Sequence, residues 1–79
     1  MTREEIIATA KDVLAEEFEV EQEVMEDDAN IKDALELDSL AIVDLVAVIE
    51  HTFKVKIPAS ELPAVNTFSK LYDYIESHM

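Results

Sequence analysis

The chain of 79 residues contains no cysteine and no glycine, and each absence excludes a class of function. Without cysteine there can be no disulfide, no thiolate zinc site and no cysteine nucleophile. Without glycine the chain lacks the glycine-rich loops that hold phosphates and the turn that an EF-hand calcium loop requires. The longest apolar stretch, Leu40–Ile49, is interrupted by Asp44. It falls far short of the roughly 20 residues of a membrane helix, so we expect no membrane span.

Basic residues are also scarce, since only six oppose nineteen acidic residues and the formal net charge is −13. Eleven of the acids lie between residues 16 and 38 with a single base, Lys32, which leaves that stretch at −10. A surface this negative repels nucleic acid and attracts basic protein patches, although the same acidity also suits a protein that merely stays soluble. We expect a cytoplasmic monomer that binds basic protein surfaces and no nucleic acid.

Apolar residues nevertheless make up 49% of the chain, which is too large a share for a disordered acidic tail. The length suits one small domain over residues 1–79. A first helix is predicted over residues 3–17, because Thr2 and Glu5 form a capping-box pattern and apolar residues then recur at helical spacing.

A long loop is predicted over residues 19–37, with a short helical turn between residues 31 and 35. Since no glycine is available, we expect any left-handed residue in this loop to be Asn30 or an aspartate. The apolar residues of the loop are expected to be buried beneath it: Val20, Val24, Met25, Ile31, Leu35 and Leu37.

A second long helix is predicted to begin at Asp38-Ser39 and to continue to residue 53. Its inner apolar face has helical spacing and consists of Ile42, Leu45, Val46, Ile49 and Phe53. Its nearly opposite face consists of Leu40, Val43, Asp44 and Ala47. Because a surface helix needs only one apolar face, the second face either packs against the protein or is offered to a partner.

The last third of the chain is predicted to hold a short helix and a longer one. An extended segment over residues 54–57 leads to Pro58, a short helix follows over residues 59–62, and Pro63 ends it. Asn66 or Thr67 caps the final helix, whose inward residues are Phe68, Leu71, Tyr72 and Ile75. We therefore predict an all-α four-helix bundle of three longer helices and one short helix, with a long loop between helices one and two.

The sequence offers no catalytic constellation. His51 and His78 are predicted to face solvent, and a bundle this small has no room for a deep pocket around a Ser-His-Asp triad. The acidic stretch lacks the spacing of a calcium-binding loop. We therefore assign no catalytic residue and no metal site, and we expect no enzyme activity.

The most informative residue is Ser39, where the acidic loop meets the most apolar helix. In one interpretation, Asp38 or Ser39 only caps the helix by accepting a backbone N–H. In the other, the Ser39 hydroxyl is an attachment point, and a phosphate ester there would face free N–H groups at the positive end of the helix dipole.

The segment DALELDSL resembles the D-S-L motif of acyl carrier proteins, with Asp38, Ser39 and Leu40 as the motif itself. The resemblance extends along essentially the whole chain, through Leu45-Val46, Ile49-Glu50, Phe53, Ile57-Pro58, Thr67 and Asp73-Tyr74-Ile75. It implies a four-helix fold and a 4′-phosphopantetheine arm esterified to Ser39, which a phosphopantetheinyl transferase installs from coenzyme A with Mg²⁺. The arm would supply the thiol that this cysteine-free chain lacks.

The resemblance also implies a recognition surface for acyl-loading and acyl-processing enzymes that carry basic patches. Leu40, Val43 and Ala47 would form its apolar stripe, and Asp38, Asp44 and Glu50 would be the polar neighbours. The alternative is that this stripe packs against the short helix.

The chain departs from the fatty-acid carrier pattern at several positions. Glu36 replaces the usual glycine, Ala41 follows Leu40, and Lys54 and Lys56 stand where acids are usual. These differences favour a specialised polyketide, lipid or cell-envelope pathway. Two alternatives remain open: an aminoacyl or peptidyl carrier, and an unmodified acidic helical interaction module. An aliphatic cleft between the inner face of the second helix and Leu62 and Val65 would favour acyl cargo.

Overall fold

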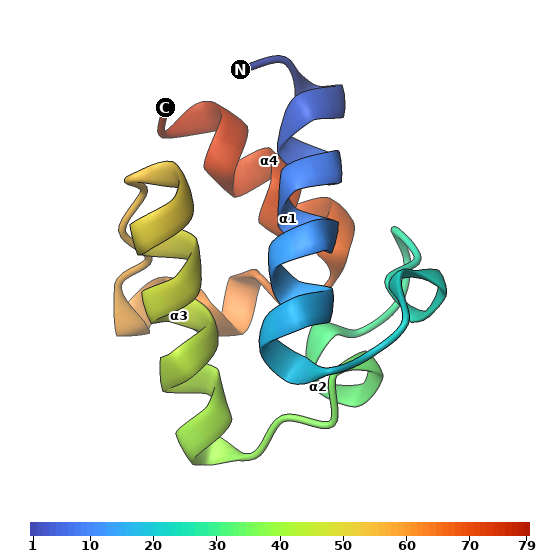
Figure 1. Cartoon of the computed structure of the whole chain (residues 1–79). Coiled ribbons are helices and arrows are strands. Elements are labelled where there is room, and N and C mark those ends of the chain that lie inside the picture. The colour runs from blue at the N-terminus through green and yellow to red at the C-terminus, as the bar shows by residue number, and fades with distance from the viewer.

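The computed structural model describes all 79 residues, and every regular element in it is helical. Three longer helices, α1 (Arg3–Phe18), α3 (Ser39–Phe53) and α4 (Phe68–Ser77), surround one core, and both chain termini lie at the same end of the bundle (Figure 1). The predicted all-α fold is confirmed. The predicted short helix is η2 (Ala59–Ala64), and the loop after α1 adds η1 (Gln22–Val24) and the single turn α2 (Ile31–Ala34).

Each α-helix begins at a side chain that accepts a backbone hydrogen bond. The predicted capping box of α1 is confirmed: Thr2 Oγ1 accepts from Glu5 N at 3.2 Å, and Glu5 Oε1 accepts from Thr2 N at 3.0 Å. The cap of α3 is Asp38 and not Ser39, since one Asp38 oxygen accepts from Leu40 N at 3.1 Å and from Ala41 N at 2.8 Å. Sequence analysis left both choices open, and the carboxylate takes the role.

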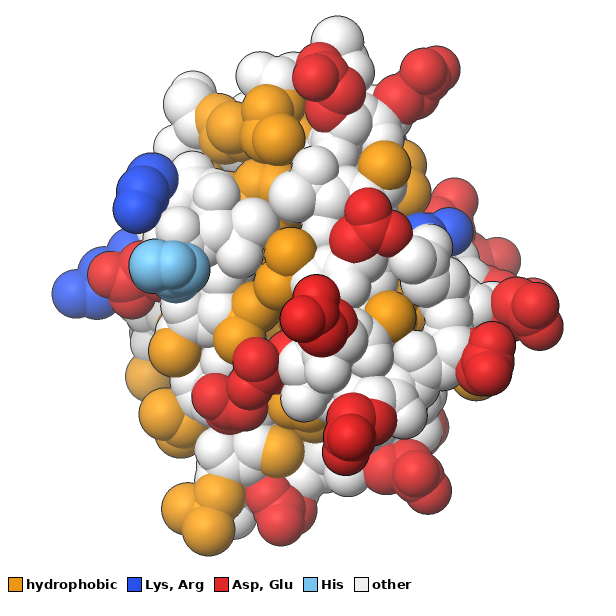
Figure 2. Space-filling view, viewed as in Figure 1, with side chains coloured by type: hydrophobic (Ala, Val, Ile, Leu, Met, Phe, Trp, Pro, Cys, Tyr) orange, Lys and Arg blue, Asp and Glu red, His pale blue; other side chains and the backbone are white.

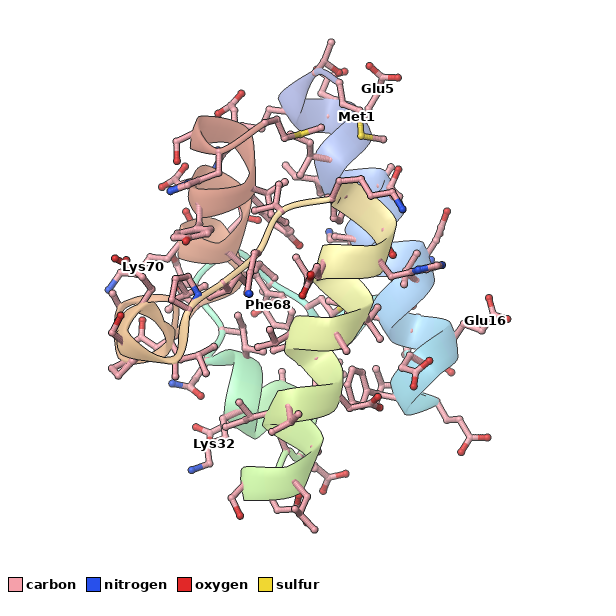
Figure 3. The ribbon with its side chains drawn as sticks, turned by 90° about the vertical axis from the view of Figure 1, so that its left-hand side faces the viewer. Met1, Glu5, Glu16, Lys32, Phe68 and Lys70 are labelled. Atoms are coloured by element: carbon pink, nitrogen blue, oxygen red, sulfur yellow. The ribbon has the colours of Figure 1, made fainter.

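The core consists of 16 buried residues, none of them charged. The predicted inward residues of α4 are all buried, and in Figure 3 Phe68 points into the interior. The inner face of α3 contributes Leu45, Ile49 and Phe53. Tyr72 is buried with its hydroxyl unpaired, and desolvation raises its pKa to about 12.

The loop between α1 and α3 is tied to the start of α4 by three backbone hydrogen bonds. Ile31 N donates to Asn66 O at 2.9 Å, Phe68 N to Ala29 O at 3.4 Å and Ser69 N to Asp27 O at 3.0 Å. Most of the predicted apolar residues of the loop are buried beneath it, but Val24 is 41% exposed. The prediction for Val24 was wrong because η1 lies on the outer side of the loop, away from the core (Figure 1).

Left-handed backbone occurs at Glu19, Glu36 and Lys54, with φ of 54°, 52° and 61°. The prediction that Asn30 or an aspartate would hold this conformation in the loop was wrong. Asn30 has φ of −73° and caps α2 instead. Glu19 and Lys54 end α1 and α3, where a left-handed residue commonly terminates a helix.

The predicted end of the short helix at Pro63 was also wrong. The 3₁₀ helix η2 includes Pro63 and continues to Ala64. Proline removes only its own N–H and presets a helical φ, so the i to i−3 bonds on either side survive. Glu61 N donates to Pro58 O at 2.9 Å and Val65 N donates to Leu62 O at 3.1 Å.

Removing the α3 cap should weaken the fold, whereas removing the neighbouring hydroxyl should not. We expect Asp38→Ala to lower the free energy of unfolding by about 0.5–2 kcal/mol, because two N–H groups lose their acceptor. Ser39→Ala should change it by less than about 0.5 kcal/mol, since alanine is the better helix former. Urea unfolding of the unmodified chain measures both. An equal loss in the two variants would contradict the assignment of Asp38 as the cap.

Replacing Glu36 with glycine should stabilise the fold. A left-handed residue with a β-carbon costs about 1–2 kcal/mol, which exceeds the roughly 0.5–1 kcal/mol of chain entropy that glycine loses on folding. We expect Glu36→Gly to be more stable than Glu36→Ala by about 0.5–1 kcal/mol, because alanine keeps the β-carbon. Thermal unfolding compares the two variants. Equal melting temperatures would show that Glu36 bears no such strain.

Candidate functional site

Ser39 is the first residue of α3 and is exposed to solvent. Its hydroxyl takes part in none of the hydrogen bonds around the helix start, because the Asp38 carboxylate occupies the N–H groups there. The helix fixes the position of Ser39, while the residue itself is exposed. A free, exposed hydroxyl on a rigid element is what an enzyme that esterifies serine requires.

The same geometry narrows the choice of N–H groups that a phosphate on Ser39 could meet. A phosphate on Ser39 was expected to face free N–H groups at the helix start, yet Leu40 N and Ala41 N already donate to Asp38. The carboxylate also places a negative charge beside the ester. Of the first three backbone N–H groups of α3, only that of Ser39 has no acceptor.

The outer face of α3 is exposed, which excludes the alternative that it packs against the short helix. Leu40 is 80% exposed and Val43 is 66% exposed. Asp44, Ala47 and Glu50 are exposed as well. In Figure 2, hydrophobic side chains and acidic groups lie together over the lower part of α3, the end that starts at Ser39.

A second acidic residue stands beside this face. The pKa of Glu17 is raised, first by hydrogen bonding with the Asp44 carboxyl and then by the negative charge of that group. Glu17 belongs to α1 and Asp44 to α3, so the pair forms only when the two helices pack. Sequence analysis missed Glu17, and no local pattern in the chain could have indicated it.

The opposite end of α3 is basic. Lys54 and Lys56 line a shallow hollow together with Ala47, Glu50 and His51. The only ion pairs of the protein are those of Arg3 with Asp73 and Glu76, so both lysines are free of carboxylate partners. His51 and His78 are exposed, as predicted. The charge along α3 thus changes from acidic near Ser39 to basic at Lys54.

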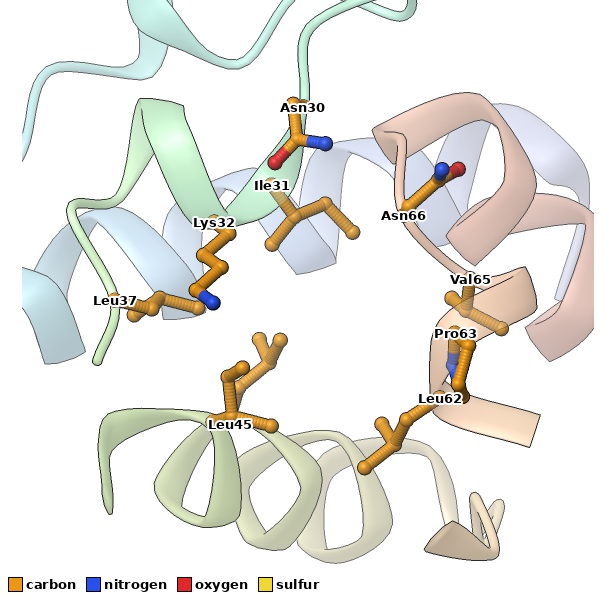
Figure 4. A pocket seen from close by; sticks show the side chains of 10 residues that line it. Asn30, Ile31, Lys32, Leu37, Leu45, Leu62, Pro63, Val65 and Asn66 are labelled. Carbon is orange, nitrogen blue, oxygen red and sulfur yellow. The ribbon is translucent and has the colours of Figure 1, made fainter. Parts of the chain in front are cut away.

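A cavity of about 290 Å³ lies between α2, α3 and η2 (Figure 4). The predicted aliphatic wall of Ile42, Leu45, Leu62 and Val65 is confirmed. Val46 and Ile49, which were also expected there, do not line the cavity: Ile49 is part of the buried core, and Val46 packs against that core. The remaining lining residues were not predicted: Asn30, Ile31, Lys32, Leu37, Pro63 and Asn66.

The structure brings together no group of three histidine, cysteine, aspartate or glutamate side chains that could hold a metal ion. None of the helices has the length and apolar character that crossing a membrane demands.

Known proteins resemble this chain over nearly its whole length. A family model described as the phosphopantetheine attachment site matches residues 8–75. The acyl carrier protein of Lactobacillus johnsonii is 33% identical over 78 residues, which cover 99% of this chain and 98% of that protein. The acyl carrier protein of Thermotoga maritima is also 33% identical over 78 residues, covering 99% and 96%. That of Syntrophobacter fumaroxidans is 34% identical over 64 residues, covering 81% and 79%.

The family match spans α3 and the loop before it, and the helical architecture agrees with the predicted carrier fold. Together with an exposed serine at the start of α3 and full-length similarity to several acyl carrier proteins, it establishes the family. The chain belongs to the acyl carrier protein family.

Proposed function

We propose that Ser39 bears the 4′-phosphopantetheine arm of this acyl carrier protein. The observation that supports the assignment most directly is the exposed Ser39 hydroxyl, which no hydrogen bond holds, at the start of α3. Asp38 and Leu40 flank it, the first as the helix cap and the second as an apolar contact for the transferase. The arm supplies a thiol, on which acyl groups are carried as thioesters.

The attachment is a transfer from coenzyme A. The Ser39 oxygen forms an ester bond with the phosphorus on the pantetheine side, the diphosphate bond of coenzyme A breaks, and 3′,5′-ADP leaves. The hydroxyl proton passes to a base of the transferase. This chain contributes the nucleophile and its position, and we propose that it is not itself an enzyme.

We propose that partner enzymes bind the outer face of α3. Val43 and Ala47 give an apolar stripe, and Asp44 with its neighbour Glu17 offers two carboxylates to a basic partner residue. A cation that bridges this pair would also relieve their mutual repulsion. Glu50 lies beside Lys54 and Lys56, so the partner surface would be basic near Ser39 and less basic at the far end of α3.

We further propose that the cargo is an acyl group of a fatty-acid, polyketide or related lipid pathway in the cytoplasm. The cavity supports this choice over an aminoacyl group, since aliphatic side chains make up most of its wall. A methylene chain gains about 0.8 kcal/mol for each CH₂ removed from water. An ammonium group would lose its hydration there without a carboxylate to replace it.

Incubation with a broad-specificity transferase, Mg²⁺ and coenzyme A should add the mass of one phosphopantetheine to the chain. Ser39→Ala should abolish the addition, whereas Ser60→Ala, which changes another exposed serine, should not. Intact-mass spectrometry of the folded variants measures the result. An unchanged mass of the native chain would refute the carrier function and favour an unmodified acidic interaction module.

Loading the arm with octanoyl should raise the melting temperature and shift amide signals of α3 and η2. Loading with alanyl should leave both near the values of the unacylated carrier, because the ammonium stays in water. Thermal unfolding and NMR of the two loaded forms make the comparison. If octanoyl and alanyl changed the melting temperature and the amide signals equally, the cavity would not bind the acyl chain. The experiment would then favour neither an acyl nor an aminoacyl carrier.

A further inference from the structure

Lys32 places a positive charge on a cavity that is otherwise apolar or amide-lined. It is the only charged residue among those that line the cavity, and it is the only base between residues 16 and 38. In Figure 4 its ammonium group reaches from α2 toward Leu37 and Leu45. Lys32 is also exposed to solvent, so this charge stands at the rim of the cavity and not in its depth.

The ammonium group has no partner within the protein. The ion pairs of the chain all belong to Arg3, although many acids surround Lys32 in the sequence. Two amides also line the cavity, and in Figure 4 Asn66 lies across the cavity from Lys32. Asn30 uses its oxygen to cap α2 at 3.2 Å from Asp33 N, which leaves its amide N–H groups free, and the Asn66 side chain makes no hydrogen bond. The cavity therefore offers a cation and hydrogen-bond donors.

A purely alkyl chain would match the aliphatic wall but would make no interaction with the cation at the rim or with the amide groups. A chain that ends in a carboxylate satisfies both parts. Its methylenes pack against Ile42, Leu45 and Leu62, and its terminal carboxylate meets Lys32 at the rim. Because the rim is open to water, the carboxylate keeps part of its hydration, and the cost of burying a charge is small.

We propose that the cavity selects acyl chains that end in a carboxylate, that is, dicarboxylic acids bound to the arm through one of their two carboxyl groups. The proposal rests on the carrier function proposed above and names its substrate class. The phosphodiester of the arm itself is the other anion within the molecule. It is bonded to Ser39, which does not line the cavity, whereas Lys32 does.

The test compares three arms of equal chain length: octanoyl, octanedioyl and the monomethyl ester of octanedioyl. A broad-specificity transferase attaches each from its coenzyme A derivative. In the native sequence, octanedioyl should raise the melting temperature by about 1–8 °C more than the neutral ester, as expected for one exposed ion pair in a domain of this size. The ε-carbon signal of Lys32 should shift with octanedioyl alone.

Lys32→Met, which keeps an unbranched side chain only one atom shorter and removes its charge, should abolish the advantage of octanedioyl and favour octanoyl. Lys70→Met is the matched control, because Lys70 is an exposed lysine of α4 that lies apart from Lys32 and the cavity (Figure 3). It should behave like the native chain. An advantage of octanedioyl that persists in Lys32→Met, or no advantage in the native chain, would overturn the proposal.

Two further outcomes are informative. Lys32→Met could lower the melting temperature of the carrier with an unacylated arm as much as that of the octanedioyl form. Lys32 would then form its ion pair with the phosphodiester of the arm, and the proposal fails. If no arm can be attached at all, the carrier function fails first. That outcome is seen in the intact mass before any melting experiment.

Discussion

Three backbone hydrogen bonds between the loop after α1 and the start of α4 hold together the part of the protein around Ser39 and the cavity. They fix α2 opposite α3, and the space left between α2, α3 and η2 is the cavity. Leu35 and Leu37 are buried in the core, so the chain approaches Asp38 from a defined direction. A loop that carries eight acids and one base over residues 19–37 would not be ordered by its own local preferences.

The helix α3 serves the fold with one face and the function with the other. Leu45, Ile49 and Phe53 are buried, while Leu40 and Val43 are among the most exposed apolar side chains of the protein. The two roles are therefore separable, because a change on the outer face removes no core contact. Asp38 joins them: its carboxylate starts the helix and thereby sets the position of the neighbouring serine.

The distribution of charged side chains over the surface matters in this protein as well as its net charge. The pair of Glu17 and Asp44 lies near Ser39, and the pKa of Glu17 is raised first by its hydrogen bond with Asp44 and then by the charge of that carboxyl. Lys54 and Lys56 reverse the sign at the other end of α3, and Lys32 does so at the cavity. The surface that a partner or a cargo would contact therefore has both acidic and basic regions, which the net charge of −13 does not describe.

The sequence by itself determined the three longer helices, the inward residues of α4 and the place of Ser39, because each depends on spacing or capping within a few residues. The motif around Ser39 was likewise visible as a resemblance. Tertiary structure alone decided which residue caps α3, that Glu36 is left-handed, and that Val24 is exposed. It also decided that Glu17 meets Asp44 and that Lys32 reaches the cavity. These last features join segments far apart in the chain, and their geometry follows from packing that no local pattern encodes.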